Sequence, residues 1–263
     1  MKIIVLGAGH MGRWLISELA GDNSVRVYDI DRARTVDLPP LVVLATPSEI
    51  EAFQPELFIN AASLQNTLRA FESAMPYLPE HCLLVDVASV KGEIPAFYKS
   101  AGFRFASVHP MFGPTFANVQ RLADENAIII SESDPLGKKF FRDLFERLGL
   151  KIFEYSFDEH DRMIARSLAL PFVSTMVFAA CMERATVPGT TFKKHLEIAR
   201  GLLSEDDYLL AEIIFGPHSL EQLERVTSRL EFLKHVIRGR EFEEAKSFFA
   251  KLRKNIGSSP LGA

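Results

Sequence analysis

The sequence predicts an α/β fold, with a doubly wound parallel sheet in the first half of the chain and helices alone in the second. Two observations lead to this prediction. Short β-branched runs alternate with helical patterns up to about Ser156, which is the signature of βαβ units. Beyond that point the spacing of apolar residues is helical almost throughout. We therefore expect two domains, an α/β domain at residues 1–156 and a helical domain at residues 157–257.

The strands are expected where short apolar runs occur. Residues 2–6 are continuously apolar, as befits a parallel strand that is buried on both faces. The second strand, residues 25–28, ends on Asp29. The remaining runs lie at residues 41–45, 57–60, 82–87, 103–108, 126–130 and 150–155. The last two are expected at the edges of the sheet.

The helices of the second half are predicted from apolar spacing and capping residues. A long helix should begin near Glu159, with Asp158 as its N-cap. The apolar run 167–181 contains Pro171 and is too short to span a bilayer, so we expect a helix buried inside the protein. Four more helices are expected at residues 191–203, 206–214, 219–237 and 241–255.

The composition limits the classes of function. The 263 residues are 48% hydrophobic and 24% charged with a net charge of −4, which is typical of a soluble globular protein without a nucleic-acid or membrane partner. Cys82 and Cys181 are far apart, and neither stands at metal-ligand spacing from a histidine. We therefore expect no disulfide framework and no metal site, and a reducing cytoplasm as the compartment.

A glycine-rich turn, Gly7-Ala8-Gly9-His10-Met11-Gly12, follows the first strand and opens a helix. In that context Gly7 makes the tight turn, Gly9 lets the backbone approach a pyrophosphate, and Gly12 lets the helix pack closely on the strand. The amides at the start of the helix would face the phosphate charge. The turn therefore predicts a Rossmann-type dinucleotide site.

Asp29 bears on the choice of cofactor. It ends the second strand, where a carboxylate accepts hydrogen bonds from ribose hydroxyls and repels the 2′-phosphate of NADP. This favours NAD, although Arg32 and Arg34 just downstream weaken the preference. The residues expected to bind the cofactor are Gly7, Gly9, His10, Met11, Gly12, Asp29, Ala61, Ala62 and Ser63.

Two further motifs stand at the ends of consecutive strands: Asp86-Val87-Ala88-Ser89-Val90-Lys91 and His109-Pro110-Met111-Phe112-Gly113-Pro114. Ligands of parallel sheets bind outside the carboxyl ends of the strands, so the two motifs should converge. Alone, His109 would more often be a packed core histidine, and Ser89-Val90-Lys91 a helix start. Together they predict a site in which His109 accepts a proton, beside the hydroxyl of Ser89 and the charge of Lys91.

In this order the three motifs resemble those of the prephenate dehydrogenase family, and the similarity extends from residue 1 to about 256. Glu159-His160-Asp161 also resembles a family feature, although His160 alone is typical of a helix-start residue beside Asp161. The resemblance implies NAD-dependent oxidative decarboxylation of prephenate to 4-hydroxyphenylpyruvate, a step of tyrosine biosynthesis. It also implies a homodimer formed by the helical half.

The resemblance assigns a role to each polar residue. His109 accepts the proton or hydrogen bond of the ring hydroxyl as hydride leaves the carbon that bears it. Ser89 hydrogen-bonds that hydroxyl and orients His109, while Lys91 completes the site. Loss of carbon dioxide and aromatisation drive the reaction, so no metal is implied. Activity should then decline as His109 protonates, near its ordinary pKa of about 6.5.

The two carboxylates of prephenate should require a cation, and Arg200 is the leading candidate. It follows Leu196 by four residues, so it should lie at the edge of an apolar stripe rather than in open solvent. The resemblance places a substrate-binding arginine in this helix. A structural ion pair of Arg200 is the alternative, and Arg162 and Arg166 are rivals.

Other functions remain open at this point. Arogenate dehydrogenase is the nearest, since one or two residues of the pocket could decide between the substrates. An NAD(P)-dependent β-hydroxyacid or imine reductase would share the two halves but would lack the paired Ser89 and His109 motifs. A nucleotide-sensing dimer would leave those motifs without a purpose.

Overall fold

The computed structural model describes the whole chain except residues 40–41, 45, 113–121, 184–186 and 258–263. Its sheet has seven strands in the order β2-β1-β3-β4-β5-β6-β7. They are β1 (Lys2–Leu6), β2 (Ser24–Tyr28), β3 (Leu57–Asn60), β4 (Leu83–Asp86), β5 (Arg104–Pro110), β6 (Asn126–Ile130) and β7 (Lys151–Tyr155). All neighbours are parallel except β5 and β6. The strand order reverses between β1 and β3, which is where such sheets bind ligands.

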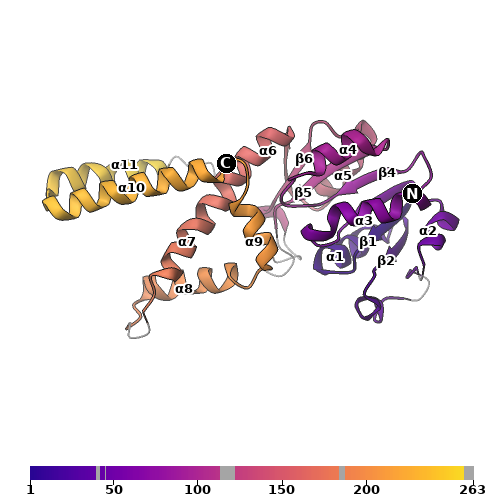
Figure 1. The fold of residues 1–263 in the computed structure, drawn as a ribbon, viewed down its shortest axis with the longest axis horizontal. Coiled ribbons are helices and arrows are strands. Elements are labelled where there is room, and N and C mark those ends of the chain that lie inside the picture. The colour runs from indigo at the N-terminus through magenta and orange to yellow at the C-terminus, as the bar shows by residue number, and fades with distance from the viewer. Residues whose placement is uncertain (40–41, 45, 113–121, 184–186, 258–263) are drawn as a thin grey trace.

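Helices follow the strands and then continue alone. Those of the first half are α1 (His10–Leu19), α2 (Pro47–Phe53), α3 (Thr67–Ala74), α4 (Ile94–Ala101) and α5 (Pro135–Arg147). Those of the second half are α6 (Phe157–Ile164), α7 (Leu170–Ala180), α8 (Thr190–Leu202), α9 (Asp207–Ile214), α10 (Ser219–Gly239) and α11 (Phe242–Gly257). The molecule is elongated, with the sheet at one end and the α10–α11 hairpin projecting at the other (Figure 1).

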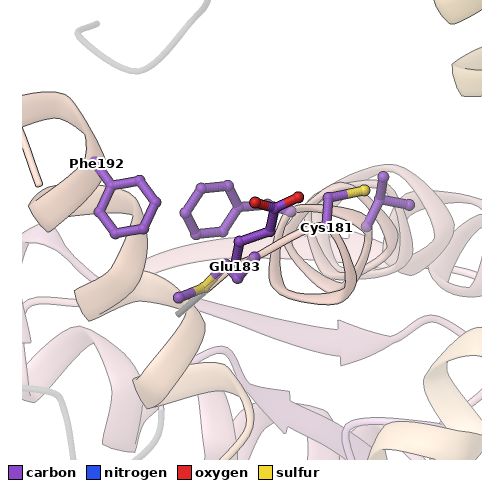
Figure 2. A pocket seen from close by; sticks show the side chains of 6 residues that line it. Cys181, Glu183 and Phe192 are labelled. Carbon is purple, nitrogen blue, oxygen red and sulfur yellow. The ribbon is translucent and has the colours of Figure 1, made fainter. Parts of the chain in front are cut away.

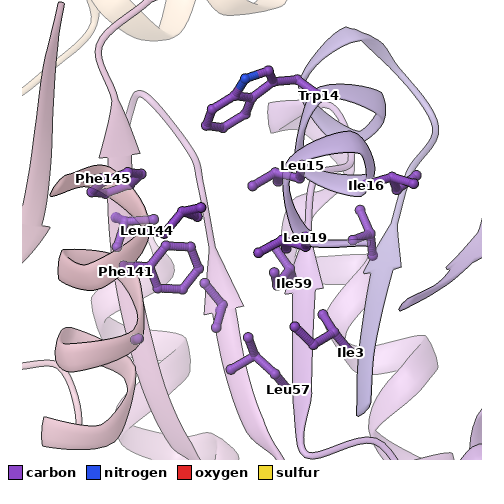
Figure 3. Close-up of a cluster of buried hydrophobic side chains, with 14 of the residues drawn as sticks. Ile3, Trp14, Leu15, Ile16, Leu19, Leu57, Ile59, Phe141, Leu144 and Phe145 are labelled. Atoms are coloured by element: carbon purple, nitrogen blue, oxygen red, sulfur yellow. The ribbon is translucent and has the colours of Figure 1, made fainter. Parts of the chain in front are cut away.

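The core lies on both faces of the sheet because strand side chains alternate between them. Ile3 and Val5 face one layer, in which α1 and α5 cover the sheet (Figure 3). Ile4 and Leu6 face the other layer, which α2, α3 and α4 cover. This two-sided burial explains why the first strand is continuously apolar.

The predicted strands are largely confirmed, with three corrections. In the run 41–45, Val43 forms an isolated bridge with Val27, and residues 41 and 45 lie outside the described residues. The strand predicted at 103–108 continues to Pro110, because its last residues pair with the antiparallel β6. For the same reason β6 lies between β5 and β7, and the prediction that it is an edge strand is wrong.

The last four helices, α8 to α11, start and end within two residues of the prediction, whereas α7 begins three residues later than predicted and the cap of α6 differs. Helix α6 begins at Phe157, and its N-cap is Ser156 rather than Asp158. Ser156 and Glu159 form a reciprocal capping box, in which the Glu159 carboxylate accepts from the Ser156 amide at 2.8 Å. This arrangement satisfies two donors at once, which Asp158 could not do.

The prediction that residues 167–181 are buried inside the protein is wrong for the single chain. Helix α7 has no buried residue, since it extends away from the sheet and packs on α8 and α10. A π-helical segment, Ala165–Ala169, precedes it and accommodates Pro171, which lacks an N–H. The continuous helix Phe157–Ala180 is long and apolar enough to cross a membrane by length and composition, with 17% of its most apolar window buried.

Candidate active site

The glycine turn has the geometry that its spacing predicts. Gly7 has a φ of +96°, and a Cβ there would come within 2.8 Å of the Ala61 carbonyl oxygen. A Cβ on Gly12 would collide with the carbonyl of Gly7. Apart from Gly9 itself and its chain neighbours, no described residue has an atom within 4 Å of the Cβ position of Gly9. Gly7 and Gly12 are therefore required by the fold, while Gly9 borders open space in which a ligand could approach the backbone.

Asp29 stabilises the local backbone, in addition to its predicted role in binding the cofactor. Its Oδ2 accepts from the Ala8 amide at 2.7 Å and its Oδ1 accepts from the Asp31 amide at 2.8 Å. Asp29 therefore ties the glycine turn to the end of β2. Each carboxylate oxygen retains capacity for another hydrogen bond, and the residue lines the cleft beside the turn.

That cleft has a volume of about 340 Å³. It brings together predicted residues from three segments, namely Gly7, Gly9, Asp29, Ala61, Ala62 and Ser63. His10, Met11 and Gly12 lie just beyond it, at the start of α1. Asn60 holds the third segment, residues 61–63, because its side chain accepts from the Ala62 amide at 3.1 Å and donates to the Thr67 carbonyl at 2.8 Å. Arg34 and Arg69 also line the cleft, and Arg69 was not predicted.

His109 is buried near the end of β5 and meets a second histidine there. Its Nδ1 lies 3.1 Å from Nε2 of His160, which is fully buried on α6. Nδ1 of His160 lies 3.2 Å from Oδ1 of Asp161. The remaining motif residues Gly113 and Pro114 lie outside the described residues.

The hydrogen bonds that link Asp161, His160 and His109 determine which ring nitrogens carry a proton. The Asp161 carboxylate can only accept, so Nδ1 of His160 donates to it. A neutral His160 then has an unprotonated Nε2, which accepts from Nδ1–H of His109. A neutral His109 is thereby left with a lone pair on Nε2. This is the nitrogen that could accept a proton from a ligand.

The pKa values favour neutral imidazoles. Burial lowers the pKa of His109 well below its ordinary value, and the nearby His160 and Lys91 lower it further. Burial also lowers the pKa of His160, against the opposing effect of the Asp161 carboxylate. Both rings are therefore neutral at neutral pH, as a proton acceptor requires.

The structure does not support the expectation that Lys91 faces a substrate. Its ammonium is enclosed, and it pairs with Asp86 at 2.7 Å and donates to the Val108 carbonyl at 2.9 Å. The Asp86 carboxylate also accepts from the Tyr98 hydroxyl at 2.9 Å. Because Val108 precedes His109, Lys91 anchors the strand that carries the histidine. Its charge also acts on the imidazole through the low dielectric of the core.

Ser89 lies half-buried in the loop after β4, and the described residues offer its hydroxyl no hydrogen-bond partner. It does not orient His109 in this structure, because His160 occupies that position at Nδ1. The Ser89 hydroxyl is thus available for a ligand, and the proposed contact with a substrate stays a prediction.

Arg200 is not placed as the apolar stripe predicted. It is exposed on α8, next to the buried Ala199, and lines none of the three cavities described here. Helix α8 packs on α7, and Ala199 is its one buried residue, so the adjacent Arg200 faces solvent. The rival Arg162 pairs with Asp158 at 2.9 Å. The other rival, Arg166, is exposed in the π-helical segment before α7. Among the described residues, no hydrogen bond or ion pair links any of the three predicted arginines to His109.

A second cavity, of about 290 Å³, lies between the end of α7 and α8 (Figure 2). Phe178 and Phe192 meet there with their ring centroids 5.6 Å apart. Apart from Cys181 and Glu183, the described lining is apolar, and it holds no cation. An anionic substrate therefore has no charge complement in this cavity.

The sequence reasoning missed His160 as a functional residue and treated it as a helix-start residue. A signal was present, because Phe157, His160 and Ile164 share one face of α6 at helical spacing, and the latter two are buried. A histidine within an inward-facing stripe must find a polar partner. The identity of that partner depends on a contact across 51 residues of sequence.

Known proteins were compared with the chain. No protein-family model matches it. It is 23% identical over 97% of its length to a probable arogenate/prephenate dehydrogenase of Methanocaldococcus jannaschii, and spans 60% of that protein. It is 26% identical over 98% of its length to the chloroplastic arogenate dehydrogenase 1 of Arabidopsis thaliana, and spans 43% of it. The crystal structure of Aquifex aeolicus prephenate dehydrogenase with hydroxyphenyl propionate and NAD+ superposes with a TM-score of 0.81, at 17% identity and 98% coverage of both chains.

The mostly parallel sheet, the glycine turn and the helical second half define a Rossmann-type α/β fold followed by a helical half. The relatives confirm the resemblance that the three motifs carry. The chain is thus similar to prephenate and arogenate dehydrogenases over nearly its whole length.

Proposed function

We propose that the chain catalyses the NAD-dependent oxidative decarboxylation of prephenate to 4-hydroxyphenylpyruvate, with arogenate as the alternative substrate. The observation that carries this proposal is the buried, neutral His109 near the carboxyl end of β5, in the same sheet as the glycine turn. An alcohol that loses hydride becomes acidic, and a neutral imidazole is the group that accepts its proton at neutral pH. The amino or keto group that distinguishes the two substrates lies away from that alcohol.

Each residue of the site would have its own role in the reaction. The chemistry that a bound NAD supplies is acceptance of hydride from the carbon that bears the ring hydroxyl. Nε2 of His109 would accept the hydroxyl proton, and the Ser89 hydroxyl would hold the same oxygen in place. Lys91 and Asp86 would keep the end of β5 rigid. General-base help of this kind is typically worth about 10²–10⁴-fold in rate.

The lining of the cleft suits the cofactor chemically. Gly7 and Gly9 would admit the pyrophosphate at the start of α1, and Asp29 would accept from the ribose hydroxyls. We propose NAD rather than NADP because the Asp29 carboxylate would repel a 2′-phosphate. Arg34 and Arg69 line the same cleft, so the discrimination should be moderate.

Replacing Asp29 with alanine should raise the KM for NAD about 10- to 100-fold, because hydrogen bonds to a charged group contribute about 1.5–3 kcal/mol. It also removes the acceptor of the Ala8 amide. Asp29→Asn, which keeps an oxygen acceptor, is the matched control and should lose less NAD affinity while gaining activity with NADP. Initial rates with both cofactors provide the measurement. A wild-type protein that already prefers NADP would contradict the assignment.

A direct assay tests the function. Absorbance at the NADH band is followed with prephenate or arogenate, each with NAD and with NADP. Reduction with one of these substrates and NAD is the expected result, and the ratio of kcat/KM values identifies the preferred substrate. Absence of reduction in all four combinations would overturn the proposal.

The pH profile should differ from that of a free histidine. Because burial, together with the nearby His160 and Lys91, lowers the pKa of His109 well below 6.5, the base should stay unprotonated through pH 6.5. Activity should be lost only when the pH falls through that lowered pKa. This prediction differs from the decline near 6.5 that an ordinary histidine would give. A plot of kcat/KM against pH, with an acid limb at 6.5 or above, would contradict this environment for His109.

We also propose that a second copy of the chain covers α7, giving a homodimer through the helical half. The support is an apolar helix without a buried residue, flanked by the apolar cavity of Figure 2. Burying this surface against a like surface would be favourable, since each Å² of apolar area removed from water contributes roughly 25 cal/mol.

Val177→Asp should convert the dimer to a monomer, because it places a charge on α7, where Val177 is 41% exposed. Light scattering should give about twice the chain mass for the wild type and the chain mass for the variant. Val36→Asp, on an 83% exposed residue of the α/β half, is the control and should stay dimeric. A monomeric wild type would refute the proposed dimer.

A further inference from the structure

His109 is linked to the helical half of the chain through His160. We propose, on the basis of the function above, that His160 and Asp161 are positioning residues for the reaction. They hold His109 in the tautomer that leaves Nε2 free to accept the substrate proton. They also share the positive charge that His109 acquires during the reaction.

The link is built from two elements and is closed to water. His109 comes from β5 and His160 from α6, and the two residues are 4% and 0% exposed. Their ring nitrogens lie 3.1 Å apart, within hydrogen-bond distance. No water competes for a hydrogen bond in such a place, so the bond sets the ring orientation strongly.

Asp161 decides which way the chain of hydrogen bonds runs. With its carboxylate at 3.2 Å, His160 keeps its proton on Nδ1 and accepts at Nε2. Without that acceptor, His160 could carry its proton on Nε2 and donate to His109. His109 would then hold its own proton on Nε2 and could not act as a base. The same logic governs serine hydrolases, in which a carboxylate fixes the tautomer of the catalytic histidine.

The proton balance of the reaction is compatible with these hydrogen bonds between His109, His160 and Asp161. The O–H bond of the ring hydroxyl breaks and an N–H bond forms at Nε2 of His109. The proton on Nδ1 can then shift to His160, whose own Nδ1–H shifts towards Asp161. After carbon dioxide leaves, the ring oxygen takes a proton back from Nε2 and becomes the phenol. The proton shifts reverse, and no net proton is released.

The groups around His109 explain why a positive charge on its imidazole would require stabilisation by a further anion. The charged and titratable groups around the two imidazoles are Lys91 and Asp86 near the end of β4, Tyr98 on α4, and Asp161 on α6. Lys91 and Tyr98 both bind Asp86, so that carboxylate is already engaged. Asp161 is the anion that remains for the histidine pair among these groups.

Asp161 also reaches water, which lets it carry charge at low cost. Its side chain is 24% exposed and lines a cavity of about 90 Å³ together with Val90, Glu212 and Ser219. A cavity of this size has room for water molecules. The chain of hydrogen bonds therefore runs from the buried base to a solvated carboxylate.

Kinetics of His160→Gln and Asp161→Asn test the proposal. Both should lower kcat about 10- to 100-fold, within the range that general-base help contributes, while the KM for substrate and the Kd for NAD change little. In Asp161→Asn the acid limb of kcat/KM should move to lower pH, because the carboxylate that favours a positive charge on the histidine pair is gone. Glu212→Gln is the control, since Glu212 lines the same cavity and should leave both values unchanged. A loss of activity with an unmoved acid limb would indicate a merely structural role and overturn the proposal.

A second measurement does not depend on activity. Nitrogen-15 NMR of histidine-labelled wild-type protein should show His109 and His160 neutral, each with its proton on Nδ1. A proton on Nε2 of His109 would overturn the positioning role whatever the substrate. A wild type with the expected tautomers that reduces NAD with neither prephenate nor arogenate would instead show that the proposed function, and the positioning role with it, is wrong.

Discussion

Replacing His109 with asparagine should lower kcat by about 10²–10⁴-fold, the usual contribution of a general base. Asparagine is close in size and can still hydrogen-bond to His160, so the fold and the glycine turn should persist. The cofactor cleft is lined by other residues, and NAD binding should therefore stay nearly unchanged. Steady-state kinetics combined with a titration of NAD binding separate the two effects.

The control for this variant is His195→Asn. His195 is an exposed histidine on α8, whose Nδ1 lies 3.2 Å from the Thr191 carbonyl. It should retain wild-type turnover. Near-wild-type turnover of His109→Asn itself would remove His109 from the chemistry and leave it as a core residue.

Replacing Lys91 with methionine should lower the free energy of unfolding by about 3–5 kcal/mol, the usual cost of removing one partner of a buried ion pair. Lys91 and Asp86 have no exposed side-chain surface, and their charged atoms lie 2.7 Å apart. Methionine fills a similar volume but leaves the Asp86 carboxylate buried without a cation. Urea unfolding at neutral pH measures the change.

Lys138→Met provides the comparison for Lys91. Lys138 pairs with Glu154 at 3.0 Å, but both side chains are partly exposed. Its removal should therefore cost about 1 kcal/mol or less. If Lys91→Met proved as stable as Lys138→Met, Lys91 would not be the structural anchor described here, and the direct substrate contact would regain support.

The fold could be predicted because its signals are local. A continuous apolar strand, a glycine turn and a helix follow one another at residues 2–19, and each is stabilised mainly by its own neighbours. The predicted strand at 41–45 failed as a regular strand because a short apolar run does not by itself specify a pairing partner. The buried position predicted for α7 failed because periodicity reports an apolar helix but not what covers it.

The site could be predicted in part for the same reason. The glycine turn and Asp29 act through nearby backbone, so their spacing was informative. The link between His109 and His160 joins segments 51 residues apart and depends on how α6 docks on the sheet. Asp86 precedes Lys91 by five residues in the motif. Their pairing, however, depends on β5, whose Val108 carbonyl also accepts from Lys91, so it could not be predicted from local sequence.

The proposed activity of this chain is the oxidation of a cyclohexadienol that carries a carboxylate, with NAD as the hydride acceptor. The most direct measurement is a product balance, in which purified protein is incubated with NAD and the substrate preferred in the assay. NADH, carbon dioxide and the aromatic product should then form in equal amounts. Formation of NADH without carbon dioxide, or no NADH from a folded protein that binds NAD, would contradict the account.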